Sequence, residues 1–227
     1  MSLQKKDFIE VDFTGRVKDG EVFDSTIKED LEKLHHGHDH EHVEARPLIF
    51  CLGEGMFLES IDDFLIGKQV GSVYEIELLP EKAFGNRNKE LIQMMPLKIF
   101  REKNINPVTG ATFNFDGRIG RVLSVSGGRI MVDFNHFLAG KTVAYKIKVL
   151  RKIDGLNEKV QALNQFFFRK NFKYEINENK LIMEVEAPLV KLVELFKDKF
   201  KEMLGLDVEI KEVEIKEEKE ETPEKTN

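Results

Sequence analysis

The stretch Ile9-Glu10-Val11-Asp12-Phe13 alternates apolar with acidic side chains. Successive side chains of a strand point to opposite faces of a sheet, so this alternation predicts a strand with one buried face. The same interpretation applies to three further segments, which are residues 48–52, 74–78 and 143–149. Half-exposed strands of this kind are typical of an antiparallel sheet.

One short helix is expected between the second and third of these strands. Leu58, Ile61 and Leu65 fall at helical spacing, and Gly67 is placed to end the helix. The sequence therefore predicts an antiparallel sheet with one face covered by a single short helix.

The segment between the third and fourth strands carries elements of its own, because a structureless connection of this length is uncommon inside a compact domain. A short helical turn broken by Pro96 is expected within residues 91–100. Strands joined by glycine-rich turns at Gly117 and Gly127 are expected at residues 112–115, 119–125 and 129–134. We interpret this segment as an inserted β-rich domain.

The chain beyond Arg151 is interpreted as a third unit. The predicted order is a helix, a hairpin, a second helix and a strand, at residues 156–167, around 177–179, 188–204 and 206–215. This order predicts a small α+β domain, through which a homodimer could form. The glutamate-rich end, residues 216–227, is expected to be disordered, because it has too few apolar side chains to offset its ordering entropy.

Composition excludes several classes of protein. No apolar run approaches the roughly 20 residues that span a bilayer, so no membrane anchor is expected. The net charge of −6 gives no general attraction to nucleic acid. The single cysteine, Cys51, cannot form an intrachain disulfide, and within a predicted strand it is interpreted as a buried, unreactive thiol. We expect a cytoplasmic protein.

The familiar motifs of nucleotide-binding and hydrolytic enzymes are absent. The sequence has no P-loop, no zinc-protease helix motif and no serine-hydrolase elbow, and Gly53-Glu54-Gly55 lacks the third glycine of a dinucleotide-binding loop. What remains is a set of aromatic and aliphatic side chains around one acid, Asp24. On composition alone they would be an ordinary hydrophobic core, but their order and spacing indicate a site.

Five motifs follow one another in the first 85 residues, namely Val11 to Gly15, Phe23-Asp24-Ser25-Thr26, Leu52-Gly53, Gly67-x-x-Val70-Gly71 and Ala83-Phe84-Gly85. Their order and spacing resemble the FKBP-type peptidyl-prolyl isomerases. The run from Asp133 to Lys141, followed by the strand through Tyr145, resembles the segment by which SlyD-like and long archaeal members return from an inserted chaperone domain. The resemblance covers residues 1–152.

The resemblance implies an α+β fold in which an antiparallel half-barrel sheet wraps one short helix. It assigns residues 1–86 and 135–152 to the FKBP domain and residues 87–134 to an inserted client-binding domain. Residues 153–215 then form the small C-terminal α+β domain.

The resemblance also implies catalysis of X-Pro cis/trans isomerisation, which breaks no covalent bond and requires no cofactor. The expected catalytic residues are the pocket walls and one polar group at the pocket edge, namely Phe13, Phe23, Asp24, Phe57, Leu58, Ile61, Phe84 and Tyr145. Leu48 and Leu138 are expected to contribute to substrate binding. A tyrosine is common in the family where Phe13 and Phe84 stand, so Asp24 is expected to lack its usual orienting hydroxyl.

The inserted segment has more methionine and phenylalanine than a domain of about 50 residues can easily bury. Flexible apolar side chains at an exposed patch suit promiscuous partners. The side chains expected to bind unfolded or proline-containing polypeptides are Met94, Met95, Leu97, Phe100, Phe113, Ile130 and Met131. The alternative, in which such residues form the core of the segment, stays open.

Five histidines lie in one stretch with interspersed carboxylates. Imidazole suits zinc and nickel, so weak divalent metal binding is expected at His35, His36, His38, His40 and His42. The alternative is a polar surface loop without metal. Two alternative functions stay open for the whole chain. The protein could be a binding-only chaperone without isomerase activity, or a metal-handling protein that uses this loop.

Overall fold

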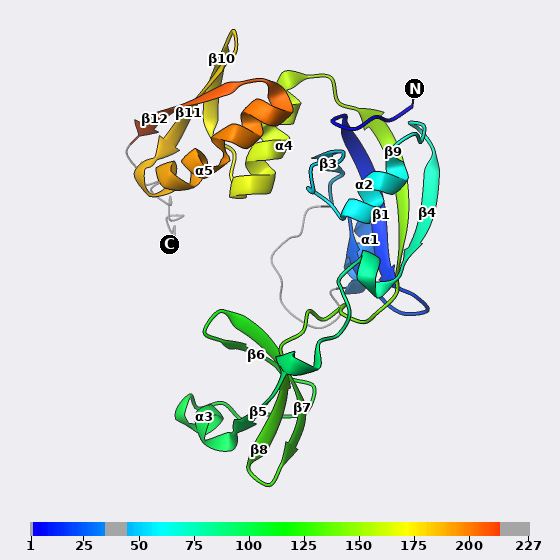
Figure 1. Cartoon of the computed structure of the whole chain (residues 1–227), viewed down its shortest axis with the longest axis vertical. Coiled ribbons are helices and arrows are strands. Elements are labelled where there is room, and N and C mark those ends of the chain that lie inside the picture. Colours follow the sequence, from blue (N-terminus) through cyan, green and yellow to red (C-terminus); the bar gives the residue numbers. More distant parts are fainter. Residues whose placement is uncertain (1, 35–44, 214–227) are drawn as a thin grey trace, which may run out of the picture. The chain divides into compact units, whose positions relative to one another are not determined.

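The computed structural model describes residues 2–34 and 45–213 (Figure 1). The chain divides into two compact units. One unit comprises residues 1–12, 47–72 and 148–227, and the other comprises residues 13–46 and 73–147. The long strands β1 (Phe8–Val17) and β9 (Val143–Lys152) contribute residues to both units.

The first sheet has five strands. Its order is β2-β1-β9-β4, and β3 also pairs with β1. The shorter strands are β2 (Val22–Ser25), β3 (Leu48–Cys51) and β4 (Val73–Leu78). The pairs β1–β2 and β1–β3 are antiparallel. The four predicted strands are confirmed, three of them from alternation and β3 from a short apolar run, and in β1 the apolar Ile9, Val11 and Phe13 are buried.

Helix α2 (Glu59–Leu65) is confirmed where it was expected. Ile61 and Leu65 are fully buried, and Gly67, two residues after the helix, has a φ of 84° that favours glycine. Helix α1 (Lys28–Leu34) was not expected. Its seven residues are mostly charged and only Leu31 among those with described side chains is an apolar buried residue, so no helical period is visible in the sequence. A 3-10 turn, η1 (Pro80–Lys82), follows β4.

The second sheet lies between residues 92 and 133 and has the order β5-β8-β7-β6. Its strands are β5 (Ile92–Pro96), β6 (Thr112–Phe115), β7 (Arg118–Ser126) and β8 (Arg129–Asp133), and all neighbouring pairs are antiparallel. A 3-10 turn, η2 (Lys89–Leu91), precedes the sheet. The buried core consists of Phe100, Phe115, Val122, Ile130 and Val132.

The expected helical turn within residues 91–100 is corrected by the structure. Residues up to Pro96 form strand β5, and helix α3 (Leu97–Glu102) begins only after the proline. The physical reason is that a residue before proline is driven out of the helical region, whereas the residue after it is not.

The third sheet has the order β10-β11-β12 and belongs to the C-terminal part of the chain. The elements are α4 (Leu156–Phe168), β10 (Lys173–Asn177), β11 (Lys180–Glu186), α5 (Ala187–Leu204) and β12 (Asp207–Val213). This confirms the predicted order of helix, hairpin, helix and strand. The pair β11–β12 is parallel, and helix α5 supplies the crossover connection that a parallel pair needs. Neither α5 nor any other helix in the described ranges is long and apolar enough to cross a membrane.

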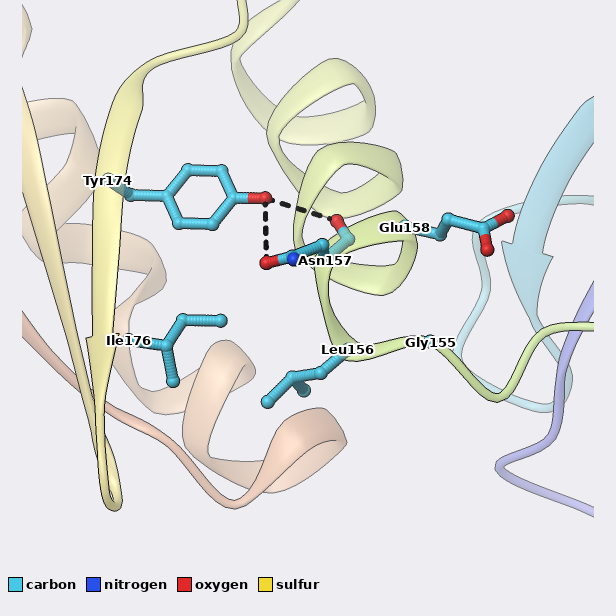
Figure 2. A pocket seen from close by; sticks show the side chains of 6 residues that line it. All are labelled: Gly155, Leu156, Asn157, Glu158, Tyr174 and Ile176. Atoms are coloured by element: carbon cyan, nitrogen blue, oxygen red, sulfur yellow. Dashed lines mark hydrogen bonds between the residues drawn. The ribbon is translucent and has the colours of Figure 1, made fainter.

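A hollow of about 630 Å³ lies between the first turn of α4 and strand β10 (Figure 2). The Tyr174 hydroxyl, which points into this region, donates to the Asn157 carbonyl oxygen at 3.3 Å. Leu156 and Ile176 provide apolar lining. None of the described residues expected to form the catalytic site lines this hollow, so we do not assign that site to it.

Candidate active site

Phe13 is held by the two hydroxyl residues at the end of β2. The Phe13 backbone N–H donates to Thr26 Oγ1 at 2.9 Å, and the Phe13 carbonyl oxygen accepts from Ser25 Oγ at 3.0 Å. Ser25 Oγ in turn accepts from the Ile27 backbone N–H at 3.0 Å. The motif Phe23-Asp24-Ser25-Thr26 therefore fixes the backbone of Phe13 through side chains as well as through strand pairing.

Four rings, one of them that of Tyr145, form a continuous series of contacts. The Tyr145 ring lies 6.1 Å from that of Phe13 and 5.7 Å from that of Phe23, the latter edge to face at 84°. Phe23 meets Phe84 edge to face at 5.9 Å and 89°. We call these four residues, Phe13, Phe23, Phe84 and Tyr145, the aromatic cluster. The separations are those of favourable aromatic pairs, so the structure brings together four of the expected catalytic residues.

The members of the aromatic cluster differ in exposure. Phe13 and Tyr145 are 4% and 3% exposed, whereas Phe23 and Phe84 keep part of their surface accessible. Phe23 and Phe84 can therefore contact a bound chain, whereas the buried Tyr145 ring packs against Phe23.

Asp24 is the carboxylate beside the cluster. Partial loss of hydration raises the pKa of Asp24, although the residue as a whole is solvent-exposed, and the backbone N–H of Ser25 opposes this rise. Burial, and then the negative charge of Asp24, raise the pKa of the Tyr145 hydroxyl. Tyr145 therefore keeps its proton at neutral pH and can act as a hydrogen-bond donor.

The expected residues of the other unit lie around the start of α2. The Phe57 ring packs 5.5 Å from the Phe50 ring, and Phe57 and Leu58 are partly exposed. Ile61 has no exposed surface. Leu48, at the start of β3, is partly exposed.

Asp62 is a residue of this region that the sequence interpretation missed. It is 1% exposed, and its Oδ2 accepts from the Gly53 backbone N–H at 3.0 Å. Burial raises its pKa to about 6, against the lowering effect of the Gly53 and Gly55 N–H groups. The sequence spacing could have revealed this burial, because position 62 lies on the same helical face as Leu58 and Leu65.

The expected client-binding residues separate into two groups. Met94 is 59% exposed and pairs across the sheet with Met131, while Met95, Leu97 and Phe113 pack partly buried against the core. The prediction is wrong for Phe100 and Ile130. Both have no exposed surface and belong to the core of the second sheet, so they cannot contact a client in this structure.

Leu138, expected to bind substrate, is only 1% exposed and lies in the segment that follows β8. Cys51 is fully buried, as expected, and burial raises the pKa of its thiol to about 12. His35, His36, His38, His40 and His42 lie outside the described residues. Within the described residues no group of three or more His, Cys, Asp or Glu side chains could hold a metal ion.

Comparison with protein families gives two matches. The model of the FKBP-type peptidyl-prolyl cis-trans isomerase matches residues 1–115. A second model, described as FKBP26, IF domain, matches residues 93–138, which include the second sheet apart from the start of β5.

Individual relatives agree with this. The chain is 32% identical over 149 residues to the short-type peptidyl-prolyl cis-trans isomerase of Methanocaldococcus jannaschii, which covers 65% of this chain and 92% of the relative. It is 30% identical over 154 residues to the FKBP-type 16 kDa peptidyl-prolyl cis-trans isomerase of Escherichia coli, covering 66% and 93%. It is 31% identical over 112 residues to the isomerase SlyD of Helicobacter pylori, covering 48% and 60%. The chain belongs to the family of FKBP-type peptidyl-prolyl cis-trans isomerases.

Proposed function

We propose that the aromatic cluster is the surface on which this isomerase turns X-Pro bonds. The observation that carries the proposal is the continuous ring-to-ring contact from Phe13 through Tyr145 and Phe23 to Phe84. It supplies an apolar wall beside a single carboxylate, Asp24. The family resemblance adds Phe57 and Leu58 as further walls, whereas Ile61, which has no exposed surface, supports packing and does not contact substrate in this structure.

The chemistry needs little beyond such a wall. The planar amide resists rotation with a barrier of roughly 18–20 kcal/mol, because its C–N bond has partial double-bond character. The twisted transition state loses amide resonance and is less dipolar than the planar ground state. An apolar, water-poor surface therefore favours the transition state relative to water. No nucleophile or proton transfer is required.

Asp24 has a secondary role in this proposal. The substitution of phenylalanine for the tyrosine common at position 13 removes one hydroxyl that could orient the carboxylate. Tyr145 retains a hydroxyl, and the charge of Asp24 acts on it. We infer that Asp24 acts through its charge on the Tyr145 hydroxyl at the polar edge of the site. The rings supply most of the transition-state stabilisation.

We further propose that residues 87–134 form an inserted client-binding domain. Support comes from the match to the FKBP26, IF domain model and from an apolar surface on the second sheet. Met94 and Ile119 are 59% and 67% exposed, and Met94 lies opposite Met131. Flexible methionine side chains adapt to varied apolar segments, which suits capture of unfolded polypeptides.

The site assignment is tested by alanine substitution in the full chain. Phe84→Ala should lower kcat/KM on a short proline peptide at least about tenfold, which corresponds to about 1.4 kcal/mol of transition-state stabilisation. Phe57→Ala should lower kcat/KM by a similar factor, because the family resemblance makes Phe57 a further wall of the site. Asp24→Ala should cost less than either.

The control is Leu195→Ala, because Leu195 is 78% exposed on α5 and is not a member of the aromatic cluster. Urea denaturation of each variant separates loss of folding from loss of catalysis. A wild-type chain no faster than buffer would overturn the catalytic proposal. Abolition of activity by Asp24→Ala alone would overturn the ring-based mechanism.

A further inference from the structure

The Phe84 ring is packed between two other rings. One is Phe23, a fellow member of the aromatic cluster, at 5.9 Å and edge to face. The other is His136, whose ring is stacked on that of Phe84 with centroids 4.9 Å apart and planes only 7° apart. Phe84 itself follows the 3-10 turn η1 and precedes Gly85, whose backbone N–H donates to the Pro80 carbonyl oxygen at 2.7 Å. Its backbone thus lies outside any strand or helix.

The orientation of the His136 ring is fixed by backbone groups of the residues that follow it. The Leu138 N–H donates to His136 Nδ1 at 3.3 Å, and the Ala139 N–H donates to the His136 carbonyl oxygen at 2.8 Å. Accepting a hydrogen bond at Nδ1 leaves the ring proton of neutral imidazole on Nε2. The buried side chain of Leu138 anchors this turn.

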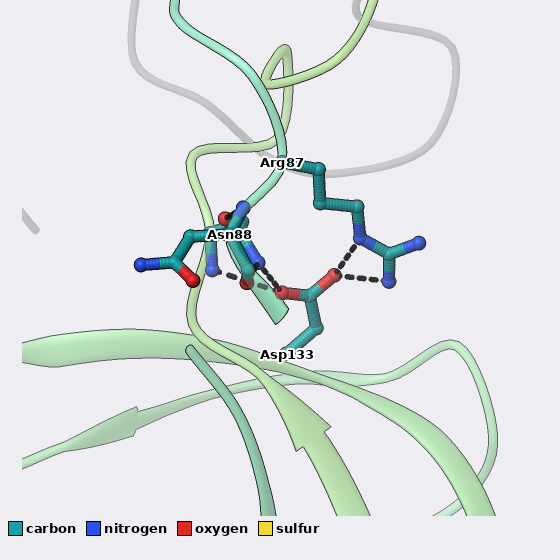
Figure 3. Close-up of polar contacts among 4 residues, drawn as sticks. Arg87, Asn88 and Asp133 are labelled. Atoms are coloured by element: carbon teal, nitrogen blue, oxygen red, sulfur yellow. Dashed lines mark hydrogen bonds and ion pairs between the residues drawn. The ribbon is translucent and has the colours of Figure 1, made fainter. Parts of the chain in front are cut away.

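The segment that carries His136 is tied to the segment that follows Phe84. Arg87 Nε and Nη2 both donate to Asp133 Oδ2, at 2.9 and 2.5 Å (Figure 3). Asn88 N–H donates to Asn135 Oδ1 at 2.8 Å, and Asn135 Nδ2 donates back to the Asn88 carbonyl oxygen at 2.9 Å. We call these four residues, Arg87, Asn88, Asp133 and Asn135, the linker clasp.

The linker clasp is reinforced on both sides. Asn135 N–H and Nδ2 donate to Asp133 Oδ1 at 2.9 and 2.6 Å, so both oxygens of the carboxylate are used. The Gly140 N–H donates to the Gly85 carbonyl oxygen at 2.8 Å. Hydrogen bonds before and after His136 therefore hold the departing and returning segments together, and the imidazole is carried to the face of Phe84.

We propose that His136 is a positioning residue of the isomerase site, whose ring holds the Phe84 ring in the orientation that contacts substrate. The inference rests on the proposed function of Phe84 as a wall. His136 is itself exposed, so its ring does not serve as core filling. A wall ring free to turn would spend less time in contact with the twisted peptide bond, and small losses of orientation reduce transition-state stabilisation.

Two substitutions separate the ring of His136 from its hydrogen-bond acceptor. His136→Asn keeps an acceptor for the Leu138 N–H, since an asparagine oxygen readily bonds the backbone two residues on, but it removes the ring. His136→Phe keeps a ring for stacking and removes the acceptor. Assayed as full chains on a short proline peptide, His136→Asn should lower kcat/KM roughly two- to tenfold, the range expected for loss of one aromatic pair. His136→Phe should restore most of that activity.

The double variant tests whether His136 acts through Phe84. In the Phe84→Ala background, His136→Asn should cause no further loss, because the ring that it positions is gone. Urea denaturation of each variant reports the stability that a purely structural role would change. If His136→Asn does not fold, His136→Ser replaces it, because a serine hydroxyl can accept from the same N–H.

The outcomes distinguish this inference from the proposed function. Loss of activity in Phe84→Ala with wild-type activity in His136→Asn would overturn the role of His136 and leave Phe84 as a wall. Equal losses in His136→Asn and His136→Phe, or additive losses in the double variant, would also overturn it. Wild-type activity in Phe84→Ala would overturn both.

Discussion

Gly15 lies against the ring of Phe23. A Cβ at position 15 would stand 2.9 Å from Phe23 Cζ and 2.9 Å from Tyr145 Cε1, closer than van der Waals contact allows. Gly15 is in β1 and faces Asp24 of β2 in the strand register. The missing side chain at position 15 therefore provides the space in which two rings of the aromatic cluster meet.

Gly15→Ala should disturb the aromatic cluster directly. We expect kcat/KM on a short proline peptide to fall about tenfold, because the added methyl group displaces the Phe23 and Tyr145 rings. Overpacking of this kind costs roughly 1–3 kcal/mol, which urea denaturation would measure. Gly155→Ala is the matched control, since its Cβ would meet the flexible carboxylate end of Glu158. Wild-type activity in Gly15→Ala would show that the cluster geometry is irrelevant to catalysis.

Asp62 should make the stability of the protein depend on pH. Its pKa is raised by burial to about 6 from 3.8, so between these values the folded chain binds more protons than the unfolded chain. The free energy of unfolding contributed by this group therefore falls as the pH rises through that window, by on the order of 3 kcal/mol in total.

Asp62→Asn removes this titration and can keep the hydrogen bond from the Gly53 N–H. The stability of the variant relative to wild type should increase from pH 4 to pH 7, as measured by urea denaturation at each pH. Asp63→Asn, at the neighbouring exposed position, is the charge-matched control. A stability difference that stays constant across the window would contradict the assignment.

Elements with a clear hydrophobic pattern can be predicted from this sequence, and elements without one cannot. The alternation at residues 112–115 predicts β6 at the residues where it is found, and α5 ends at Leu204, the end that the sequence predicts, before Gly205 with its φ of 72°. β2 contains two adjacent polar residues, Asp24 and Ser25, and α1 consists mostly of charged residues. Neither element shows a hydrophobic period, so tertiary packing rather than local pattern determines them.

The candidate site could be predicted only with help from the family resemblance. Phe13 and Tyr145 are far apart in the chain, and no spacing rule places their rings 6.1 Å from each other. Apolar composition also failed to separate surface from core at Phe100 and Ile130. Burial there follows from strand register and from the position of α3, neither of which composition reveals.

The histidine stretch, which lies outside the described residues, gives a separate prediction about metal. Calorimetric titration of the full chain with zinc or nickel should show weak binding that fades as the pH falls through roughly 6.5, because protonated imidazole cannot ligate. Replacing His35, His36, His38, His40 and His42 with serine should abolish the signal and leave peptide isomerisation intact. Unchanged metal binding in that variant would place the site elsewhere.

The last prediction concerns a division of labour between the aromatic cluster and the second sheet. A short peptide needs only the cluster, whereas an unfolded protein must first be captured, and a tethered second site raises the local concentration of its prolines. Met94→Ser combined with Ile119→Ser replaces two exposed apolar side chains without touching the buried core. Peptide isomerisation should stay within a few-fold, whereas catalysis of a proline-limited refolding reaction, which otherwise takes tens to hundreds of seconds, should fall markedly.

Excision of residues 87–133, closed with a short glycine-rich turn, extends the same test. The excision removes the whole proposed client-binding surface together with Arg87 and Asp133. Any additional loss of activity on the short peptide therefore reports the loss of the linker clasp rather than the loss of client capture. Arg121→Ser, an exposed polar change on β7, is the control for the double serine variant. Suppression of aggregation should fall in parallel with refolding catalysis. Equal refolding catalysis in wild type, the double serine variant and the excised chain would mean that the second sheet takes no part in client capture, and that its apolar side chains serve only its own packing.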